Sequence, residues 1–265
     1  MNIAELAGRL FESFPQAQAE EWDHPGLSVG DPLAEVEGIA TALDPLPATV
    51  LAASASGCNV LLTHHPAFLD APSLVTPSAL TSSLAGEVVW TAVRSGVSLV
   101  AMHTNLDRSD TALDLCASSV GLVRSGRIVE PDGYGALLEG DGSSVALLAR
   151  RLDVRLGGEA RIYGDASSVP GSVGFLSGSA GDLGRDAVER GCTCVIAGEC
   201  GYHRVLDLVA AGCAVILVGH DISELAYAGL LDRTVAACAP GIRHVRLKDE
   251  PRWMTSQMAR GRERP

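Results

Sequence analysis

The amino-acid sequence predicts an α/β fold made of two α/β units, with mixed sheets flanked by helices. Three observations support this prediction. Short apolar runs alternate with helical patterns up to residue 120, glycine and serine become dense between 121 and 191, and the alternation then resumes. Hydrophobic residues make up 47% and charged residues 20% of the 265-residue chain, which excludes a protein that is disordered overall.

The first unit is predicted from the N-terminus onward. Apolar residues at helical spacing between Ile3 and Phe14 predict a helix that ends at Pro15, and a loop rich in glycine and proline follows over 21–32. Strands and helices then alternate, which is typical of a largely parallel sheet. They are expected over the strand 38–43, the helix 47–56, the strand 59–63, the helix 80–94, the strand 97–102 and the helix 110–120.

The second, smaller unit is predicted from shorter apolar runs. A helix over 143–151 is the one clear helix that we expect before Asp182. The remaining elements are expected over the strand 173–176, the strand 193–197, the helix 202–211, the strand 214–218, the helix 222–231 and the strand 245–247. We expect residues 254–265, which are polar and basic, to form a disordered tail.

Charge and composition restrict the class of partner. The formal net charge is −12, so a nucleic-acid groove or an anionic-membrane anchor is not expected. No uncharged apolar stretch reaches the length of a membrane span, and the N-terminus lacks the pattern of a signal peptide. The seven cysteines are an odd number in mostly apolar surroundings, so we expect reduced thiols and a cytoplasmic protein.

Histidines and carboxylates follow three of the predicted strands. His64 and His65 directly follow the strand 59–63, and their two rings leave the strand in different directions, which suits two neighbouring metal ions. His103 and Asp107 follow the strand 97–102. The alternatives are a pair of hydrogen-bonded loop histidines and an aspartate that merely caps the next helix.

The third strand end adds a histidine and a glutamate one helical turn apart. His220 and Glu224 lie on the same face if a helix begins there, and glutamate can bridge two ions. The alternative is a helix start in which Glu224 acts as a cap. His203 follows a fourth strand and either lines the same cleft or lies on the surface. The segment Gly178–Gly184 offers backbone N–H groups for an anion, although such turns are common.

Together these segments resemble the YbgI-like dinuclear-metal family, also named GTP cyclohydrolase 1 type 2 homologues. The resemblance runs from near the N-terminus to about Leu231. It rests on five motifs in the family's order, namely Trp22-Asp23-His24-Pro25-Gly26-Leu27, Thr63-His64-His65-Pro66, His103 to Asp107, Gly198 to His203, and Gly219 to Glu224. His24 departs from the family pattern, which has asparagine at this position.

The resemblance implies that the second unit is inserted into the first, with residues 1–122 and 216–265 in one domain and 123–215 in the other. It also implies a homohexamer and two divalent ions per subunit. The ions would be held by His64, His65, Asp107, His220 and Glu224, with Glu224 bridging. A donor set rich in histidine favours Zn, Fe or Mn over Mg or Ca.

The resemblance and the metal pair together predict a hydrolase. The implied reaction is the metal-dependent opening of the purine ring of GTP with release of formate, in which His103 or His203 would transfer protons. The small-molecule substrate would then be a nucleotide whose phosphates rest near Gly178–Gly184. The alternatives are a metal-loaded structural or interaction protein without turnover, and a hydrolase of another small substrate such as a phosphoester.

Overall fold

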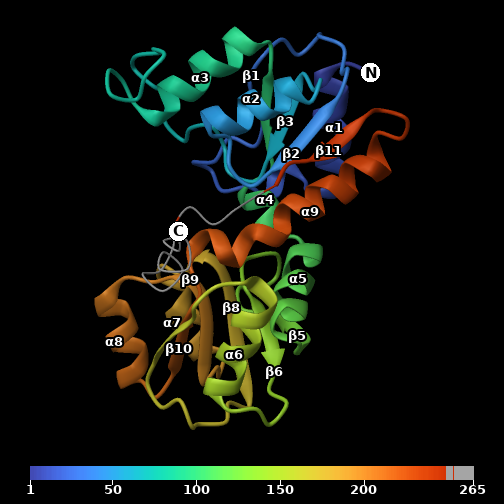
Figure 1. Cartoon of the computed structure of the whole chain (residues 1–265). Helices are drawn as coiled ribbons and strands as arrows, with labels where there is room; N and C mark the ends of the chain where they lie inside the picture. The colour runs from blue at the N-terminus through green and yellow to red at the C-terminus, as the bar shows by residue number, and fades with distance from the viewer. Residues whose placement is uncertain (249–252, 254–265) are drawn as a thin grey trace, which may run out of the picture.

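The computed structural model describes residues 1–248 and 253, and it has two lobes, each built on a mixed sheet with helices against it (Figure 1). This confirms the predicted fold class. In the described part of the chain, sheet A has the strand order β1 (Gly26–Val29), β4 (Ser98–Ala101), β3 (Val60–Thr63), β2 (Ile39–Ala42) and β11 (His244–Arg246). Sheet B has the order β5 (Val123–Arg127), β6 (Ala136–Glu139), β8 (Ser172–Ser179), β9 (Cys194–Glu199), β10 (Ala214–Leu217) and β7 (Arg161–Tyr163).

The helices match most of the predicted positions, with ends that shift by a few residues. Around sheet A lie α1 (Ile3–Ser13), the short 3-10 helix η1 (Gln16–Gln18), α2 (Pro47–Ala55), α3 (Leu84–Ser95) and α4 (Thr104–Asp107). Around sheet B lie α5 (Asp110–Val120), α6 (Val145–Leu156), α7 (Leu183–Glu189) and α8 (Tyr202–Ala210). The helix α9 (His220–Cys238) contacts elements of both lobes.

Local sequence determines several helix ends. The side chains of Ser83, Ser109 and Ser144 accept hydrogen bonds from the first turns of α3, α5 and α6. Gly96 and Gly121 end α3 and α5 in the left-handed conformation, which glycine adopts without the steric cost of a Cβ atom. These signals are short in range, so the sequence alone reveals them.

The sequence did not predict the strands β1, β5, β6 and β7, although it did predict the edge strand β11. β1 lies in the segment expected to be a glycine- and proline-rich loop, and it pairs antiparallel with β4. In sheet B, β5, β6 and β7 also pair antiparallel, in the region where apolar runs are short. Pairing with a neighbouring strand, rather than local propensity, makes these segments strands. The central strands β2, β3 and β4 are parallel, as expected.

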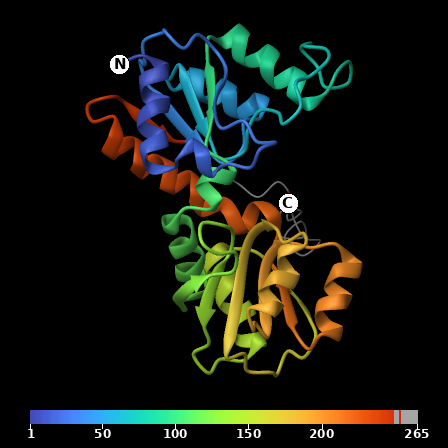
Figure 2. The ribbon, with the colours of Figure 1, turned by 180° about the vertical axis from the view of Figure 1, so that it is seen from behind.

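The chain leaves sheet A after β4, forms sheet B, and returns to sheet A at β11 through α9 (Figure 2). All the strands of sheet B therefore fall between two strands of sheet A along the sequence. The predicted domain boundaries at 122/123 and 215/216 stay a prediction. A division after residue 215 would cut β10, which spans Ala214–Leu217, so a boundary that follows the sheets lies after Leu217.

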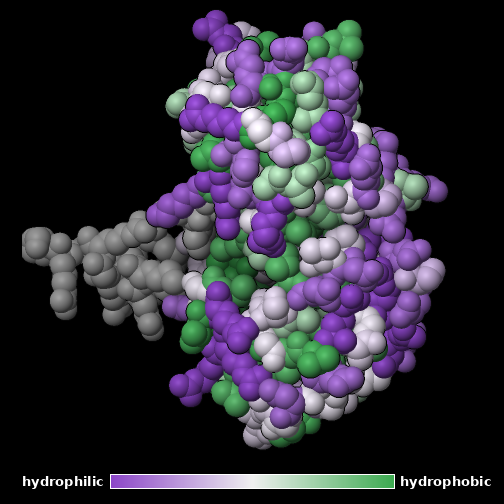
Figure 3. All heavy atoms as spheres, turned by 90° about the vertical axis from the view of Figure 1, so that its right-hand side faces the viewer, coloured by the Kyte–Doolittle hydropathy of each residue, from purple (hydrophilic) through white to green (hydrophobic). Residues whose placement is uncertain are grey.

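The helix α9 connects the two lobes through its buried residues. Tyr227, Leu231 and Val235 pack into the core beside sheet A, while Ile222 packs into the core beside sheet B. The apolar pattern predicted a helix over 222–231, but the observed helix has 19 residues, because its far end continues against sheet A. Figure 3 shows the waist between the lobes as a hollow in which apolar surface gathers.

Two further expectations concern cysteines and membranes. All seven cysteines are free, and Cys194 and Cys213 are buried in the core of sheet B, as expected for reduced thiols. Within the described residues, no helix is both long and apolar enough to cross a membrane. The cytoplasmic location stays a prediction, and the expected tail over 254–265 lies outside the described residues.

Replacement of Leu62 by alanine should destabilise the protein by about 2–5 kcal/mol, because it leaves a cavity in the core of sheet A. Leu62 lies in the middle of sheet A and is 0% exposed. The matched control is Val154→Ala on α6, where the side chain is 85% exposed. Urea unfolding followed by circular dichroism measures both changes, and equal stabilities of the two variants would contradict this description of the core.

Candidate metal centre

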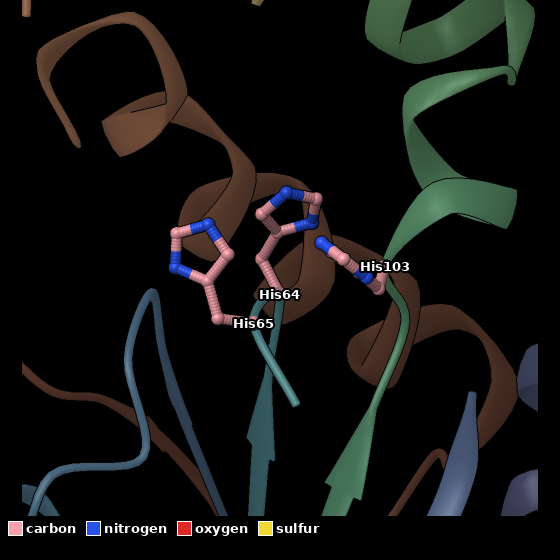
Figure 4. Close-up of side chains that lie close together, drawn as sticks. All are labelled: His64, His65 and His103. Carbon is pink, nitrogen blue, oxygen red and sulfur yellow. The ribbon is translucent and has the colours of Figure 1, made fainter. Parts of the chain in front are cut away.

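Three histidines extend from the ends of two adjacent parallel strands. His64 and His65 follow β3, and His103 follows β4, so the three rings lie side by side at one edge of sheet A (Figure 4). The ring centroids of His64 and His65 are 4.9 Å apart, and those of His64 and His103 are 5.4 Å apart. The parallel register of β3 and β4 produces this arrangement, because both strands end at the same level.

Helices bring the remaining predicted ligands to the same edge. Asp107 is the last residue of α4, the short helix that begins directly after His103. His220 and Glu224 lie in the first turn and a half of α9, and the carboxylate of Glu224 is buried. The five predicted ligands therefore come from three chain segments, and the structure brings all of them together.

The ligand atoms form overlapping groups that share Glu224. In one group, Nε2 of His65 and Nε2 of His220 lie 3.1 Å and 3.3 Å from Oε2 of Glu224. In another, Nε2 of His64 lies 3.6 Å from Oδ1 of Asp107 and 3.9 Å from Oε1 of Glu224. Within each group the candidate atoms are within 4.8 Å of one another. The two groups could hold metal ions, with one carboxylate oxygen of Glu224 facing each.

Unpartnered polar atoms show that the pocket suits a cation. Nδ1 of His64 donates a hydrogen bond of 3.0 Å to the carbonyl oxygen of Met102, which leaves Nε2 with its lone pair toward the cluster. Nε2 of His64 and Oδ1 of Asp107 are buried and have no hydrogen-bond partner. Such atoms are costly in a native protein unless something binds them, and a metal ion would satisfy both.

Two acidic residues that sequence reasoning missed fix the imidazole rings. Oδ1 of Asp44 accepts a hydrogen bond of 2.8 Å from Nδ1 of His65. Oε1 of Glu199 accepts a hydrogen bond of 3.0 Å from Nδ1 of His220. Both contacts turn Nε2 of the ring toward Glu224, the arrangement that protein metal sites use to orient histidine ligands. The sequence did contain a weak signal for these two residues, because Asp44 follows β2 closely and Glu199 is the last residue of β9.

His103 has a buried carboxylate partner of its own. Its Nδ1 donates a hydrogen bond of 3.1 Å to Oδ1 of Asp23, while the backbone N–H of Thr104 donates to Oδ2 of the same carboxylate. Burial alone would raise the pKa of Asp23, but the hydrogen bonds from His103 and Thr104 lower it to about 2. The carboxylate is therefore ionised, and it holds the other ring nitrogen of His103 toward the cluster.

The histidine rings differ in charge. Burial lowers the pKa of His64 to about 3, so its ring is neutral at pH 7, the form that binds metals. Burial also disfavours a charged His65, but hydrogen bonds with Asp44 and Glu224 outweigh it and raise the pKa of His65 to about 10. The hydrogen bond with Glu224 raises the pKa of His220 to about 9. Ions that bind His65 and His220 must therefore displace protons.

The two central carboxylates have opposite pKa shifts. Burial raises the pKa of Asp107 well above its usual range, and the nearby charge of Glu224 raises it further. Burial acts in the same direction on Glu224, but hydrogen bonds from His220 and His65 hold the pKa of Glu224 well below its usual range. A cation between the two carboxylates would remove their mutual repulsion.

The other sequence candidates lie apart from the cluster. His203 is exposed on α8, where its ring contacts Tyr202, and it does not line the cavity beside the candidate ligands. His24 is exposed, although it neighbours the buried Asp23. Of the segment Gly178–Gly184, Gly178 and Ser179 are the last residues of β8 and line the cavity beside the cluster.

Gly178 permits the close packing of β8 against Glu224. Its φ angle is +60°, and a Cβ atom at this position would clash with Oε1 of Glu224. Any larger residue would therefore push the central carboxylate out of place. Sheet B thus closes the cluster from the side opposite sheet A.

Comparison with known proteins agrees with this arrangement. The model of the family Duf34/NIF3 (NGG1p interacting factor 3) matches residues 1–251. The chain belongs to the Duf34/NIF3 family. The predicted resemblance to YbgI-like proteins is thereby confirmed, since the protein ybgI is a structural neighbour with a TM-score of 0.83, 19% identity and coverage of 95% of this chain and 99% of that chain.

Proteins from two bacteria match most of the chain. A protein from Clostridium acetobutylicum named GTP cyclohydrolase 1 type 2 homolog is 28% identical over 233 residues, which are 84% of this chain and 85% of that protein. A hypothetical protein from Staphylococcus aureus has the same fold, with a TM-score of 0.84, 22% identity and coverage of 94% of this chain and 97% of that chain.

Replacement of Glu224 by glutamine should abolish most metal binding, because the shared carboxylate faces both groups of ligands and an amide is a poor ligand. Inductively coupled plasma mass spectrometry after loading with Zn²⁺ measures the effect. The matched control is Glu189→Gln on α7, where the side chain is 65% exposed and pairs with Arg185. Equal metal content in both variants would exclude Glu224 as a shared ligand.

Proposed function

We propose that this protein binds two divalent ions of Zn, Fe or Mn and hydrolyses a small molecule at the cluster. The observation that carries the proposal is the position of the buried Glu224 carboxylate. It lies between His64 and Asp107 on one side and the histidines His65 and His220 on the other. The metal ligands would be the five predicted residues, His64, His65, Asp107, His220 and Glu224. Three imidazoles and two carboxylates suit these metals better than Mg or Ca.

The chemistry follows from this donor set. When bound by these residues, two neighbouring ions would supply Lewis-acid chemistry, lowering the pKa of water toward neutrality and polarising the group under attack. The residues of the chain would then provide the proton transfer. His103 lies beside the rings of His64 and His65, and Asp23 holds its Nδ1–H, so its other nitrogen is free to take up or release a proton. Asp23 is therefore a positioning residue for His103.

The proposed reaction is the opening of a purine ring with release of formate, with GTP as the reference substrate. The support is the name GTP cyclohydrolase 1 type 2 homolog of relatives that match most of the chain, together with the candidate metal ligands. Gly178 and Ser179 line the cavity, which supports the proposal that part of the segment Gly178–Gly184 lies near the substrate. His203, the second predicted proton donor, does not line this cavity. In the proposed reaction it would act only at the cluster of a neighbouring subunit.

We further propose that the protein assembles as a closed homohexamer. The support is the set of exposed apolar side chains on α3 and in the segment before it, where Leu80 is 98% exposed, Val93 68% and Leu84 51%. A closed ring would bury such side chains in every copy without leaving an open edge.

The catalytic proposal predicts formate release from GTP by at least one of the Zn, Fe and Mn forms. Formate dehydrogenase coupled to NADH detection measures the product. Glu224→Gln should lose the activity with the metal, whereas His103→Ala should keep near-normal metal content and lose most of the rate, because His103 acts on protons. If every metal form matches Glu224→Gln, the GTP reaction is excluded, and the alternative of a binding or structural protein without turnover gains support. Metal loss in His103→Ala would make His103 a ligand.

The assembly proposal predicts that a charge on the exposed face of α3 dissociates the hexamer. In Val93→Asp, the new carboxylate would lie in a desolvated contact, which is costly without a partner. Sedimentation velocity at micromolar concentration should show a hexamer for the parent and smaller species for the variant. Val154→Asp on α6 serves as the control. A monomeric parent protein would refute the proposal.

A further inference from the structure

A cavity of about 490 Å³ lies beside the candidate metal ligands, a size within the range of small-molecule sites. Part of its lining consists of candidate metal ligands, namely Asp107, His220 and Glu224. The strand β8 supplies the opposite wall through Leu176 and Gly178. A molecule in this cavity would therefore contact the metal ligands at one end and both lobes along its sides.

The mouth of the cavity is aromatic. Trp22 is 53% exposed, and its ring meets the ring of His103 edge-on with centroids 6.0 Å apart. Tyr134 lines the same cavity from the loop between β5 and β6, and Leu183 adds an aliphatic contact. Trp22 lines the cavity and is partly exposed, so a molecule in the cavity can reach its ring. The face of its indole offers a flat surface on which a planar ring can stack.

The charges around the cavity disfavour an anion. Among the described residues, no lysine or arginine lines it, whereas Glu20, Asp107 and Glu224 do. The nearby guanidinium of Arg108 is already engaged, because Nη1 lies 3.6 Å from Oε1 of Glu20 and Nε donates to the carbonyl oxygen of Asp132. It also lies 5.3 Å from the ring centroid of Tyr134.

Bound metal ions would not change the lining of the rest of the cavity. Away from the candidate ligands, Glu20 is the acidic residue among the described lining residues, and no lysine or arginine lies beside it in that lining. The phosphate chain of a nucleoside triphosphate would therefore find no basic partner there and would meet repulsion from Glu20.

We propose that the cavity binds an uncharged planar heteroaromatic ring, of the class of a purine base or nucleoside, stacked on Trp22, and that it discriminates against the phosphorylated forms. The inference rests on the proposed function and narrows its substrate class to the base or nucleoside, so that GTP, the reference substrate above, would be a poorer ligand than guanosine. Specificity then arises from aromatic contact at the mouth and from charge repulsion, while the cluster contacts the ring at the other end.

The first test compares guanosine, GMP and GTP with the Zn-loaded protein. In a Trp90→Phe/Trp253→Phe background, Trp22 is the remaining tryptophan of the chain, so quenching of its fluorescence reports stacking directly. We expect guanosine to bind at least about tenfold more tightly than GTP, with GMP between them. Metal content measured after each titration excludes removal of Zn²⁺ by GTP. Tighter binding of GTP than of guanosine would overturn the proposal.

The second test uses variants and isothermal titration calorimetry. Trp22→Ala should weaken guanosine binding at least about fivefold, as loss of base stacking does elsewhere, while Trp22→Phe should retain most of the affinity. Glu20→Gln should raise the affinity for GTP and leave that for guanosine unchanged. Trp90→Phe on α3 is the control. Guanosine binding that Trp22→Ala leaves unchanged would refute the stacking role.

The outcomes of these tests are separable from the test of catalysis. Guanosine binding at Trp22 without formate release would support the inference and contradict the proposed hydrolysis. Formate release from GTP, with GTP bound as tightly as guanosine, would support the hydrolysis and contradict the inference. Binding measurements therefore decide the substrate class whether or not the protein turns over.

Discussion

The buried carboxylate of Glu224 is the constraint around which the rest of this structure is arranged. An ionised carboxylate that is removed from water is costly unless opposite charges and hydrogen-bond donors surround it. His65 and His220 supply those partners at 3.1 Å and 3.3 Å, and His64 approaches the other oxygen. The strand ends of sheet A and the first turn of α9 must therefore keep fixed positions relative to each other.

The two-lobed architecture follows from the position of this carboxylate. The helix α9 begins at the waist, so its first turn faces the edge of sheet A while its neighbour β8 belongs to sheet B. Gly178 allows β8 to approach Glu224 more closely than any side chain would permit. Each lobe thus supplies one side of the cluster, and neither would enclose it alone. The cavity between them is where a substrate can reach the candidate ligands.

A surrounding layer of acidic residues links the metal centre to the choice of ligand. Asp44, Glu199 and Asp23 each accept a hydrogen bond from one imidazole, and each thereby fixes which ring nitrogen faces the cluster. The same carboxylates make the surroundings negative. In the proposals above, the binding of cations and the weaker binding of polyanions are two results of one charge distribution, while Trp22 would favour planar, uncharged molecules.

Local patterns in the sequence determined the central strands, most helices and the candidate ligands, because each depends on a few neighbouring residues. The motif around His64 and the one-turn spacing of His220 and Glu224 were visible without a structure. The tertiary structure alone decided the strands β1, β5, β6 and β7, which exist only through pairing, and the carboxylate partners of the histidines. Asp44 lies 21 residues from His65, and Asp23 lies 80 residues from His103, so no local pattern connects them. Only the packing of sheet A brings these pairs into hydrogen-bond contact.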